Sequence, residues 1–290
     1  MVAKLERELS KINDWLLINR IKINAQKSHF LVFSYRKELK LDPLRFGESL
    51  LTQCQSTKFL GVLIDDHLTF KKHVDYILSK TNKSVGILFK LNKFLPLNIL
   101  LSLYNTLILP YFNYGITCWH NAPHYALNRL VTCQKKAVRA ICSLEFNAHT
   151  NSYFRENKIL KLNDIYKVNL CATLFSYLAE PLSHPIANRF VRNSHFHNYD
   201  TRNRENFAIP LYSRSTSQSC FLYQASARWN EVPPNIKNSY TIGAFRRKYK
   251  RYILAQYWGN LISNVIEGCC GRRWGNSLAS HKTCIKFGAC

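Results

Sequence analysis

The sequence is poor in acidic residues. Its 290 residues include 17 Asp and Glu against 41 Lys and Arg, which leaves a formal net charge of +24. An excess of one sign repels itself within a compact domain and usually indicates a polyanionic partner. Nucleic acid is the commonest such partner, because lysine and arginine neutralise its phosphates and release counterions. A basic protein without a nucleic-acid role is the alternative that the charge leaves open.

The sequence also lacks a secretory leader and a cysteine framework. Its first residues, MVAKLERELSK, have the pattern of an amphipathic helix rather than of a signal peptide. The ten cysteines are scattered, and those inside apolar runs resemble small buried hydrophobes. These are Cys118, Cys133, Cys142 and Cys171. A reducing compartment, the nucleus or the cytoplasm, is therefore expected rather than secretion.

The N-terminal helix, over residues 2–20, has an apolar face that needs a partner. Leu5, Leu9, Ile12 and Leu16 share this face. A chain that starts with such a helix suggests that it is cut from something larger.

A long uncharged segment, residues 94–119, does not have the character of a membrane span. Pro96 and Pro110 break it, and three asparagines interrupt its apolar surface. A buried core helix over Leu97–Leu109 is predicted instead, and no membrane partner is expected.

No Cys-x-x-Cys pair is present, although the tail, residues 255–290, contains ligand types that zinc prefers. These are Cys269, Cys270, His281, Cys284 and Cys290. Adjacent cysteines do not form the usual chelate turn, so we expect a poorly ordered tail without zinc. No other metal site is expected.

Short apolar runs near the N-terminus predict strands. Residues 29–35, HFLVFSY, have the composition of a central strand. Residues 41–64 predict a hairpin with a turn at Gly47–Ser49 and an arm over Phe59–Ile64, which is a buried strand or the arm of a hairpin.

A long amphipathic helix is predicted from Phe70 to about Leu91. Its apolar face comprises Phe70, Val74, Ile77, Thr81, Val85 and Leu88. Its lysines are Lys72, Lys80, Lys83 and Lys90. At roughly 100° per residue these four fall within about 80° of one another. A solvated face is the ordinary explanation for such a row. The row is narrow, however, and Asp75 is the only acid between its members, which favours a helix that tracks phosphates.

The pair Asp65–Asp66 has two interpretations. Adjacent aspartates in a turn hold Mg²⁺ in two-metal polymerases. Aspartate is also a common residue at a helix start, where its carboxylate meets free N–H groups and the helix dipole. Because a helix follows at once, we predict the capping role.

Helices are also predicted over Tyr125–Cys142 and, as a helical hairpin, over Arg155–Leu182. The first is expected to expose Gln134, Lys135, Lys136 and Arg139. From Ser183 the composition changes to that of loops, and Arg246–Arg251 forms a last basic helix turn.

The junction between the predicted strand and the lysine-rich helix, KFLGVLIDDHLTFKKHV at residues 58–74, resembles a known segment. It is similar to the FLGV-x-ID…H segment of reverse transcriptases encoded by LINE-type (jockey-like) non-LTR retrotransposons. In that family the segment joins the primer grip, the last β element of the palm, to the first thumb helix. The resemblance implies that Phe59, Leu60 and Gly61 are primer-grip-like.

A second resemblance lies upstream. Asn24, Lys27 and Ser28 match the family's N-x-x-K-T/S signature, with Ser in place of Thr. The resemblance implies that Lys27 helps to protonate the departing pyrophosphate. The alternative is an exposed lysine that protects a strand edge from pairing.

Three further elements follow in the family's order. The first is LY…P…YG…W, matched by Leu103, Tyr104, Pro110, Tyr114, Gly115 and Trp119. The second is H-x-Y-x-TR…P, matched by His197, Tyr199, Thr201, Arg202 and Pro210. The third is a closing G-x-x-x-WN-x-LP-x-x-I element, matched within residues 225–239 with Ala for the usual Gly and Val for Leu. The family's metal-binding Phe/Tyr-x-Asp-Asp motif is absent from this sequence.

The combined prediction is a mainly α protein with a small N-terminal α+β element. Four segments are expected: a palm remnant with a primer-grip-like hairpin (1–66), a helical thumb-like domain (67–182), a loop-rich region (183–254) and the tail (255–290). The resemblance implies a fragment of an RNA-directed DNA polymerase that binds an RNA–DNA hybrid through Lys72, Lys80, Lys83, Lys90, Lys135, Lys136 and Arg139. Its fingers and palm, with Mg²⁺, would belong to the upstream part of the same polyprotein, and this chain would hold no cofactor. A non-catalytic nucleic-acid-binding protein and a decayed product without function are the alternatives.

Overall fold

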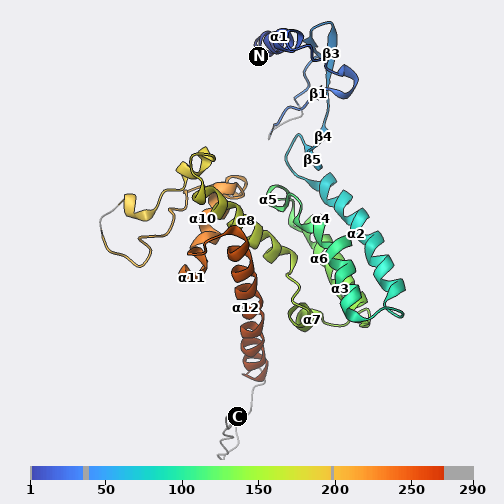
Figure 1. Cartoon of the computed structure of the whole chain (residues 1–290), viewed down its shortest axis with the longest axis vertical. Coiled ribbons are helices and arrows are strands. Elements are labelled where there is room, and N and C mark those ends of the chain that lie inside the picture. Colours follow the sequence, from blue (N-terminus) through green and yellow to red (C-terminus); the bar gives the residue numbers. More distant parts are fainter. Residues whose placement is uncertain (1, 35–38, 197–198, 271–290) are drawn as a thin grey trace, which may run out of the picture.

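The computed structural model describes residues 2–34, 39–196 and 199–270. A small N-terminal unit comes first (Figure 1), with helix α1 (Val2–Ile18), a 3-10 turn η1 (Ala25–Lys27) and strands β1 (His29–Phe30), β2 (Leu44–Phe46) and β3 (Ser49–Gln53). The strand order is β1-β3-β2, with β1 parallel and β2 antiparallel to β3. Leu9 and Leu16 of α1 pack on a small core of Leu44, Phe46 and Leu51. The helix is therefore held to the sheet by only part of its predicted apolar face, because Leu5 and Ile12 are 41% and 49% exposed.

The prediction of a central strand over residues 29–35 is wrong. Only His29 and Phe30 pair with β3, and they lie at the edge of the sheet. The last hydrogen bond of the ladder runs from Cys54 N to Phe30 O. Further along the run, Ser34 N donates to Asp66 O, which lies outside this sheet. Among the described residues no strand pairs with the other side of β1, so residues 31–34 have no ladder to join.

A second hairpin links this unit to the helices. It consists of β4 (Ser56–Phe59) and β5 (Val62–Asp65), paired from Ser56–Asp65 to Phe59–Val62. The two turn residues, Leu60 and Gly61, have φ values of 46° and 86°. Positive φ at both positions is the mark of the tight hairpin turns that match strand twist. The run Phe59–Ile64 is thus a hairpin tip and one arm rather than a continuous buried strand.

Helix α2 (Lys71–Leu91) confirms the predicted long helix and its apolar face. Phe70, Val74, Ile77, Thr81, Val85 and Leu88 are all buried. This face packs against α6 (His124–Ile141). A spacing of three and four residues therefore indicated correctly which side of the helix meets the core.

Between α2 and α6 lie three helices: α3 (Leu97–Leu107), α4 (Leu109–Asn113) and α5 (Ile116–Trp119). The helix expected over Leu97–Leu109 ends at Leu107, and Pro110 stands in the first turn of the next one, where a missing N–H costs nothing. In the part of the chain that the structure describes, no helix combines the length and apolar character that a membrane crossing requires.

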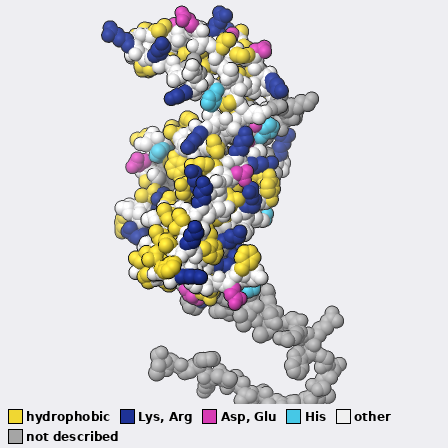
Figure 2. Space-filling model, turned by 90° about the vertical axis from the view of Figure 1, so that its right-hand side faces the viewer, with side chains coloured by type: hydrophobic (Ala, Val, Ile, Leu, Met, Phe, Trp, Pro, Cys, Tyr) yellow, Lys and Arg dark blue, Asp and Glu magenta, His cyan; other side chains and the backbone are white. Residues whose placement is uncertain are grey.

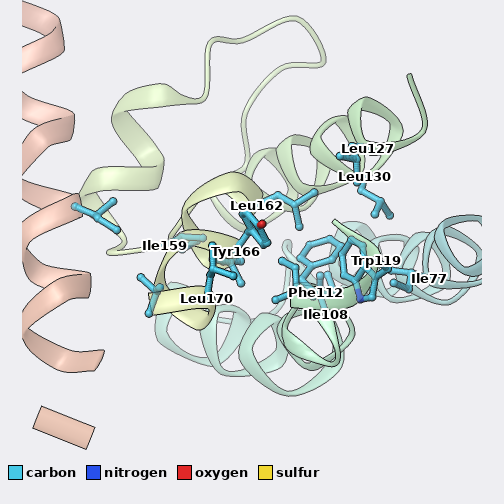
Figure 3. Packing of buried hydrophobic residues seen from close by; sticks show 14 of the residues in the cluster. Ile77, Ile108, Phe112, Trp119, Leu127, Leu130, Ile159, Leu162, Tyr166 and Leu170 are labelled. Atoms are coloured by element: carbon cyan, nitrogen blue, oxygen red, sulfur yellow. The ribbon is translucent and has the colours of Figure 1, made fainter. Parts of the chain in front are cut away.

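The main core gathers these helices around α8 (Leu162–Ala179), which follows the short helix α7 (Asn151–Glu156). The predicted helical hairpin from Arg155 is therefore one long helix after a short one. Figure 3 shows Phe112, Trp119 and Leu130 from three elements directed toward one another next to Leu162. All four side chains are fully buried.

The C-terminal region adds more helix than its composition suggested. After 3-10 turns η2 (Pro185–Arg189) and η3 (Asn193–His195) come α9 (Ser215–Gln218), α10 (Phe221–Asn230), α11 (Pro234–Lys237) and α12 (Ile242–Cys270). Trp229 stacks on Phe245 with ring centroids 5.6 Å apart, which joins α10 to α12. The basic turn expected at Arg246–Arg251 is thus part of a long helix.

One cluster of buried residues extends from Val62 to Ile253, across positions 66 and 182, at which domain boundaries were expected. His197 and the tail residues His281, Cys284 and Cys290 lie outside the described residues.

Candidate nucleic-acid interface

The four lysines predicted to share one side of α2 are open to solvent. Lys72, Lys80, Lys83 and Lys90 are all exposed, on the opposite side of the helix from much of its buried face. Figure 2, which views the molecule from the side of α2, shows Lys and Arg side chains spread along this surface with few acidic ones between them. Within the described ranges, none of the four lysines forms an ion pair.

The hairpin β4–β5 extends this row. Lys72 Nζ donates to Ser56 Oγ at 2.9 Å, which ties the start of the helix to β4. Lys58 and Lys80 lie 5.6 and 5.7 Å from the ring centroid of Tyr76, so one aromatic ring brings a hairpin lysine next to a helix lysine. We name Lys58, Lys72, Lys80, Lys83 and Lys90 the lysine row.

The one acid within the row is neutralised by a neighbouring helix. Asp75 forms a salt bridge with Arg129 of α6, and both side chains are about half exposed. Its charge therefore opposes the row less than the sequence suggested.

The predicted basic residues of α6 separate into different environments. Lys135 is exposed, and Lys136 is half-buried beside Asn82 of α2. Arg139 donates from Nε to the carbonyl of Ala148 at 3.0 Å, which is a structural contact.

Gln134 corrects a prediction, because it is buried rather than exposed. Its amide Nε2 donates to Tyr104 Oη and to Leu160 O, both at 2.9 Å, and its Oε1 accepts from Leu162 N at 3.0 Å. The side chain thus joins α6, α3 and the start of α8. A polar residue on an amphipathic helix gave no local signal of this role.

The tip of the hairpin is exposed and braced from below. Phe59 and Leu60 are 62% and 75% exposed. The hydroxyl of Tyr114 donates to Leu60 O, and Trp119 Nε1 donates to Tyr114 O at 2.8 Å. A Cβ on Gly61 would lie 3.0 Å from Cε1 of Tyr114, and its φ of +86° strains any other residue, so this position favours glycine. Tyr114 stands in one of the sequence motifs, but nothing local in the sequence indicates this contact.

Asp65 has a different task from the predicted helix cap. Its carboxylate is buried and accepts from the backbone N–H groups of His67, Thr69 and Phe70 at 3.2, 2.8 and 2.7 Å. These donors belong to the turn before α2, and the residue that caps the helix, Phe70, makes no side-chain capping bond. Asp66 pairs with His67 instead. Asp65 therefore fixes the turn that joins the hairpin to the lysine-rich helix.

Where side chains are described, within 2–34, 39–196 and 199–257, no three His, Cys, Asp or Glu side chains gather as metal ligands do.

Two histidines missed by sequence analysis pack within the helical part. His73 is buried, accepts from Leu63 N at Nδ1 (3.3 Å) and packs edge-on against Trp119. Burial lowers the pKa of His73 to about 4. His120 stacks on Tyr166 with centroids 3.9 Å apart, and burial lowers its pKa to about 4 as well. Both rings are therefore neutral at pH 7.

Lys27 lies in the N-terminal unit, at the end of η1, with an exposed side chain. Its backbone N–H donates to Asn24 O at 3.1 Å, and Ser28 Oγ donates to the same carbonyl at 2.9 Å. The three residues of the signature thus form one turn, and the chemical role of Lys27 stays a prediction.

Comparison with known proteins shows a likeness to polymerases that copy RNA into DNA. The chain is 28% identical over 158 residues to the probable RNA-directed DNA polymerase from transposon X-element of Drosophila melanogaster, covering 53% of this chain and 17% of that protein. It is 26% identical over 164 residues to the RNA-directed DNA polymerase from mobile element jockey of the same fly, covering 55% and 18%. The jockey polymerase of Drosophila funebris is equally similar, at 26% over 165 residues.

The resemblance to jockey-like non-LTR retrotransposon reverse transcriptases is therefore confirmed. The chain spans less than a fifth of the length of these relatives, 17% to 18%. No protein-family model matches it. No solved structure is significantly similar to it.

Proposed function

We propose that this chain is the thumb-like, duplex-binding part of an RNA-directed DNA polymerase of a non-LTR transposon. The observation that carries the proposal is the lysine row, which is exposed, unpaired with carboxylates in the described chain and backed by a rigid, buried helix face. Ammonium groups on one line of a helix suit a regularly spaced phosphate backbone. The similarity to transposon polymerases supports nucleic acid as the partner.

The exposed hairpin tip fits the same function. Phe59, Leu60 and Gly61 project next to the lysine row on a two-residue turn that Tyr114 braces. In this proposal the tip contacts the end of the primer strand while the row holds the duplex behind it.

The chain does not polymerise by itself in this proposal. Two-metal phosphoryl transfer needs carboxylates that hold Mg²⁺, and the Phe/Tyr-x-Asp-Asp motif does not occur in the sequence. Asp65 does not replace it, because both of its oxygens accept hydrogen bonds from the turn that follows. The upstream fingers and palm of the same polyprotein would supply the metal site.

A salt titration tests the proposal. The probe is an RNA–DNA hybrid of about 20 base pairs, and the variant is Lys80→Gln with Lys83→Gln. The matched control is Lys248→Gln with Arg251→Gln, which removes two exposed cations of α12 and leaves the same net charge.

The row variant is expected to weaken hybrid binding and to lower the slope of log K against log salt by roughly one to two units. The control should change the slope much less, and both variants should melt within about 0.5 kcal/mol of the wild type. Equal slopes for the row variant and the wild type would show that the row is only a solvated face.

A further inference from the structure

A second basic site lies away from the lysine row, in a cleft between α12, α8 and the α3–α4 pair. The cavity has a volume of about 590 Å³. Helix α8 packs on both α12 and α4, and α3 and α4 stand between α8 and α2 (Figure 1). The cleft and the lysine row are therefore separate surfaces.

The rim of the cleft is cationic. Four exposed cations line it: Lys158, Arg246, Arg247 and Lys250. Among the described residues that line it, none is acidic, and none of the four cations forms an ion pair there. Like charges brought this close without counterions favour an anionic ligand.

Apart from the four cations, the lining of the cleft is largely amide and apolar. Its asparagines are Asn105, Asn113, Asn157 and Asn169, and its apolar floor includes Leu101, Leu109, Ile165 and Val168. The amide nitrogens of Asn157 and Asn169 already donate within the protein, Asn157 to Tyr153 O and Asn169 to Ile165 O, both at 2.9 Å. Asn105 and Asn113 are exposed, and their amides offer donors and acceptors, which suits base edges and ribose hydroxyls. Apolar side chains suit the faces of unstacked bases.

We infer that this cleft binds a single-stranded segment of nucleic acid, with its phosphates on Arg246, Arg247, Lys250 and Lys158. Arg246 and Lys250 are one turn apart, about 6 Å along the helix axis, so they face successive phosphates of an extended strand. A cavity of this size matches pockets for small ligands and does not admit a duplex. A basic groove that follows the backbone is the general way in which proteins hold single strands.

This inference does not depend on the lysine row. A strand held here and a duplex held on α2 would let one chain engage the single-stranded and the paired parts of one substrate.

The test uses the whole chain and two probes: a labelled oligouridine of about 12 nucleotides and the RNA–DNA hybrid. The cleft variant is Arg246→Gln with Lys250→Gln. The matched control is again Lys248→Gln with Arg251→Gln, on the same helix, with the same loss of charge and outside the cleft lining. Oligodeoxythymidine of equal length distinguishes RNA from DNA strands.

The cleft variant is expected to lower oligouridine affinity about tenfold at low salt and to reduce the salt slope by roughly 1.4, that is, 0.7 for each lost contact. The cleft variant should bind the hybrid almost as well as the wild type does. The variant Lys80→Gln with Lys83→Gln should instead lose affinity for the hybrid and keep its affinity for oligouridine. Thermal melts confirm that each variant is folded.

Equal losses for the cleft variant and its control would overturn the inference, because net charge alone would then explain the binding. A loss confined to the hybrid would overturn it too. So would the absence of oligouridine binding together with binding of labelled polyglutamate that the cleft variant loses, since the cleft would then be a site for acidic peptide. A row variant that leaves hybrid binding unchanged would refute the proposed function without touching this site.

Discussion

At the scale of single residues, polar side chains on the inner helices connect segments that are distant in sequence. Gln134 joins three helices through three hydrogen bonds, and His73 joins β5 to α2. A buried polar group stabilises only while its partners remain, because an orphaned donor or acceptor costs its full desolvation. Substitution of these residues therefore tests the packing more sharply than substitution of a neighbouring apolar side chain.

Gln134→Ala is expected to destabilise the protein by about 2–4 kcal/mol, because Leu162 N and Leu160 O lose their partner in the interior. Urea unfolding measures the change. The adjacent exposed residue provides the control: Lys135→Ala should stay within about 0.5 kcal/mol. Equal effects of the two substitutions would contradict the burial of Gln134.

The buried neutral ring of His73 predicts a loss of stability in acid. Because its pKa is lowered from 6.5 to about 4 in the folded state, the unfolded chain binds a proton first. The part of the free energy of unfolding that depends on the neutral His73 ring is complete above about pH 6.5 and declines as the pH falls toward 4. It amounts to roughly 3 kcal/mol at most. The thermal midpoint should follow this course.

His73→Asn keeps an acceptor for Leu63 N without a titrating group. Its melting temperature should therefore vary less between pH 7 and pH 4.5 than that of the wild type. An unchanged pH profile would exclude His73 as a source of the acid sensitivity.

At the scale of elements, the hairpin β4–β5 and the helix α2 act as one unit. Asp65 fixes the turn between them, Lys72 reaches back to Ser56, and Lys58 shares Tyr76 with Lys80. The hairpin tip is thereby held in a set position relative to the lysine row. Such a rigid unit suits a surface that must place one end of a duplex.

Two glycines of this unit predict opposite effects of alanine. Gly61→Ala should destabilise by about 1–3 kcal/mol, since φ is +86° and the new Cβ would meet Tyr114. Gly86→Ala should stabilise by about 1 kcal/mol, because this helical glycine has open space around it. Chemical denaturation of both variants measures the difference. Similar effects of the two would mean that Tyr114 does not confine the turn.

At the scale of the whole molecule, a small mixed sheet precedes a helical body with one continuous core, and basic groups line both the side of α2 and the cleft at α12. This arrangement fits a part of a polymerase that holds nucleic acid, as the proposal states.

The purified chain should not extend a primer. With poly(rA)–oligo(dT) and either Mg²⁺ or Mn²⁺, incorporation should stay at background while the hybrid still binds. The physical reason is the missing metal-binding carboxylates. Incorporation that Asp65→Ala abolishes, with the fold intact, would show that the Asp65–Asp66 pair is catalytic after all.

The sequence by itself determined the local features of this protein. The spacing of Phe70 to Leu88 defined the buried side of α2 and, with it, the exposure of its lysines, because the period of a helix is a local property. The mainly α class, the hairpin before α2 and the likeness to transposon polymerases were also accessible from residue patterns and motifs.

Only the tertiary structure decided which distant residues meet. Gln134 is buried because α3 and α8 pack beside α6, and within residues 29–34 only His29 and Phe30 form a strand, because no second strand of the described chain pairs with them. The cleft combines Asn105, Lys158 and Arg246, which lie far apart in the chain. Periodicity says which face of an element is apolar, but the partner of that face is set by packing between elements, and the cleft exists only where three of them meet.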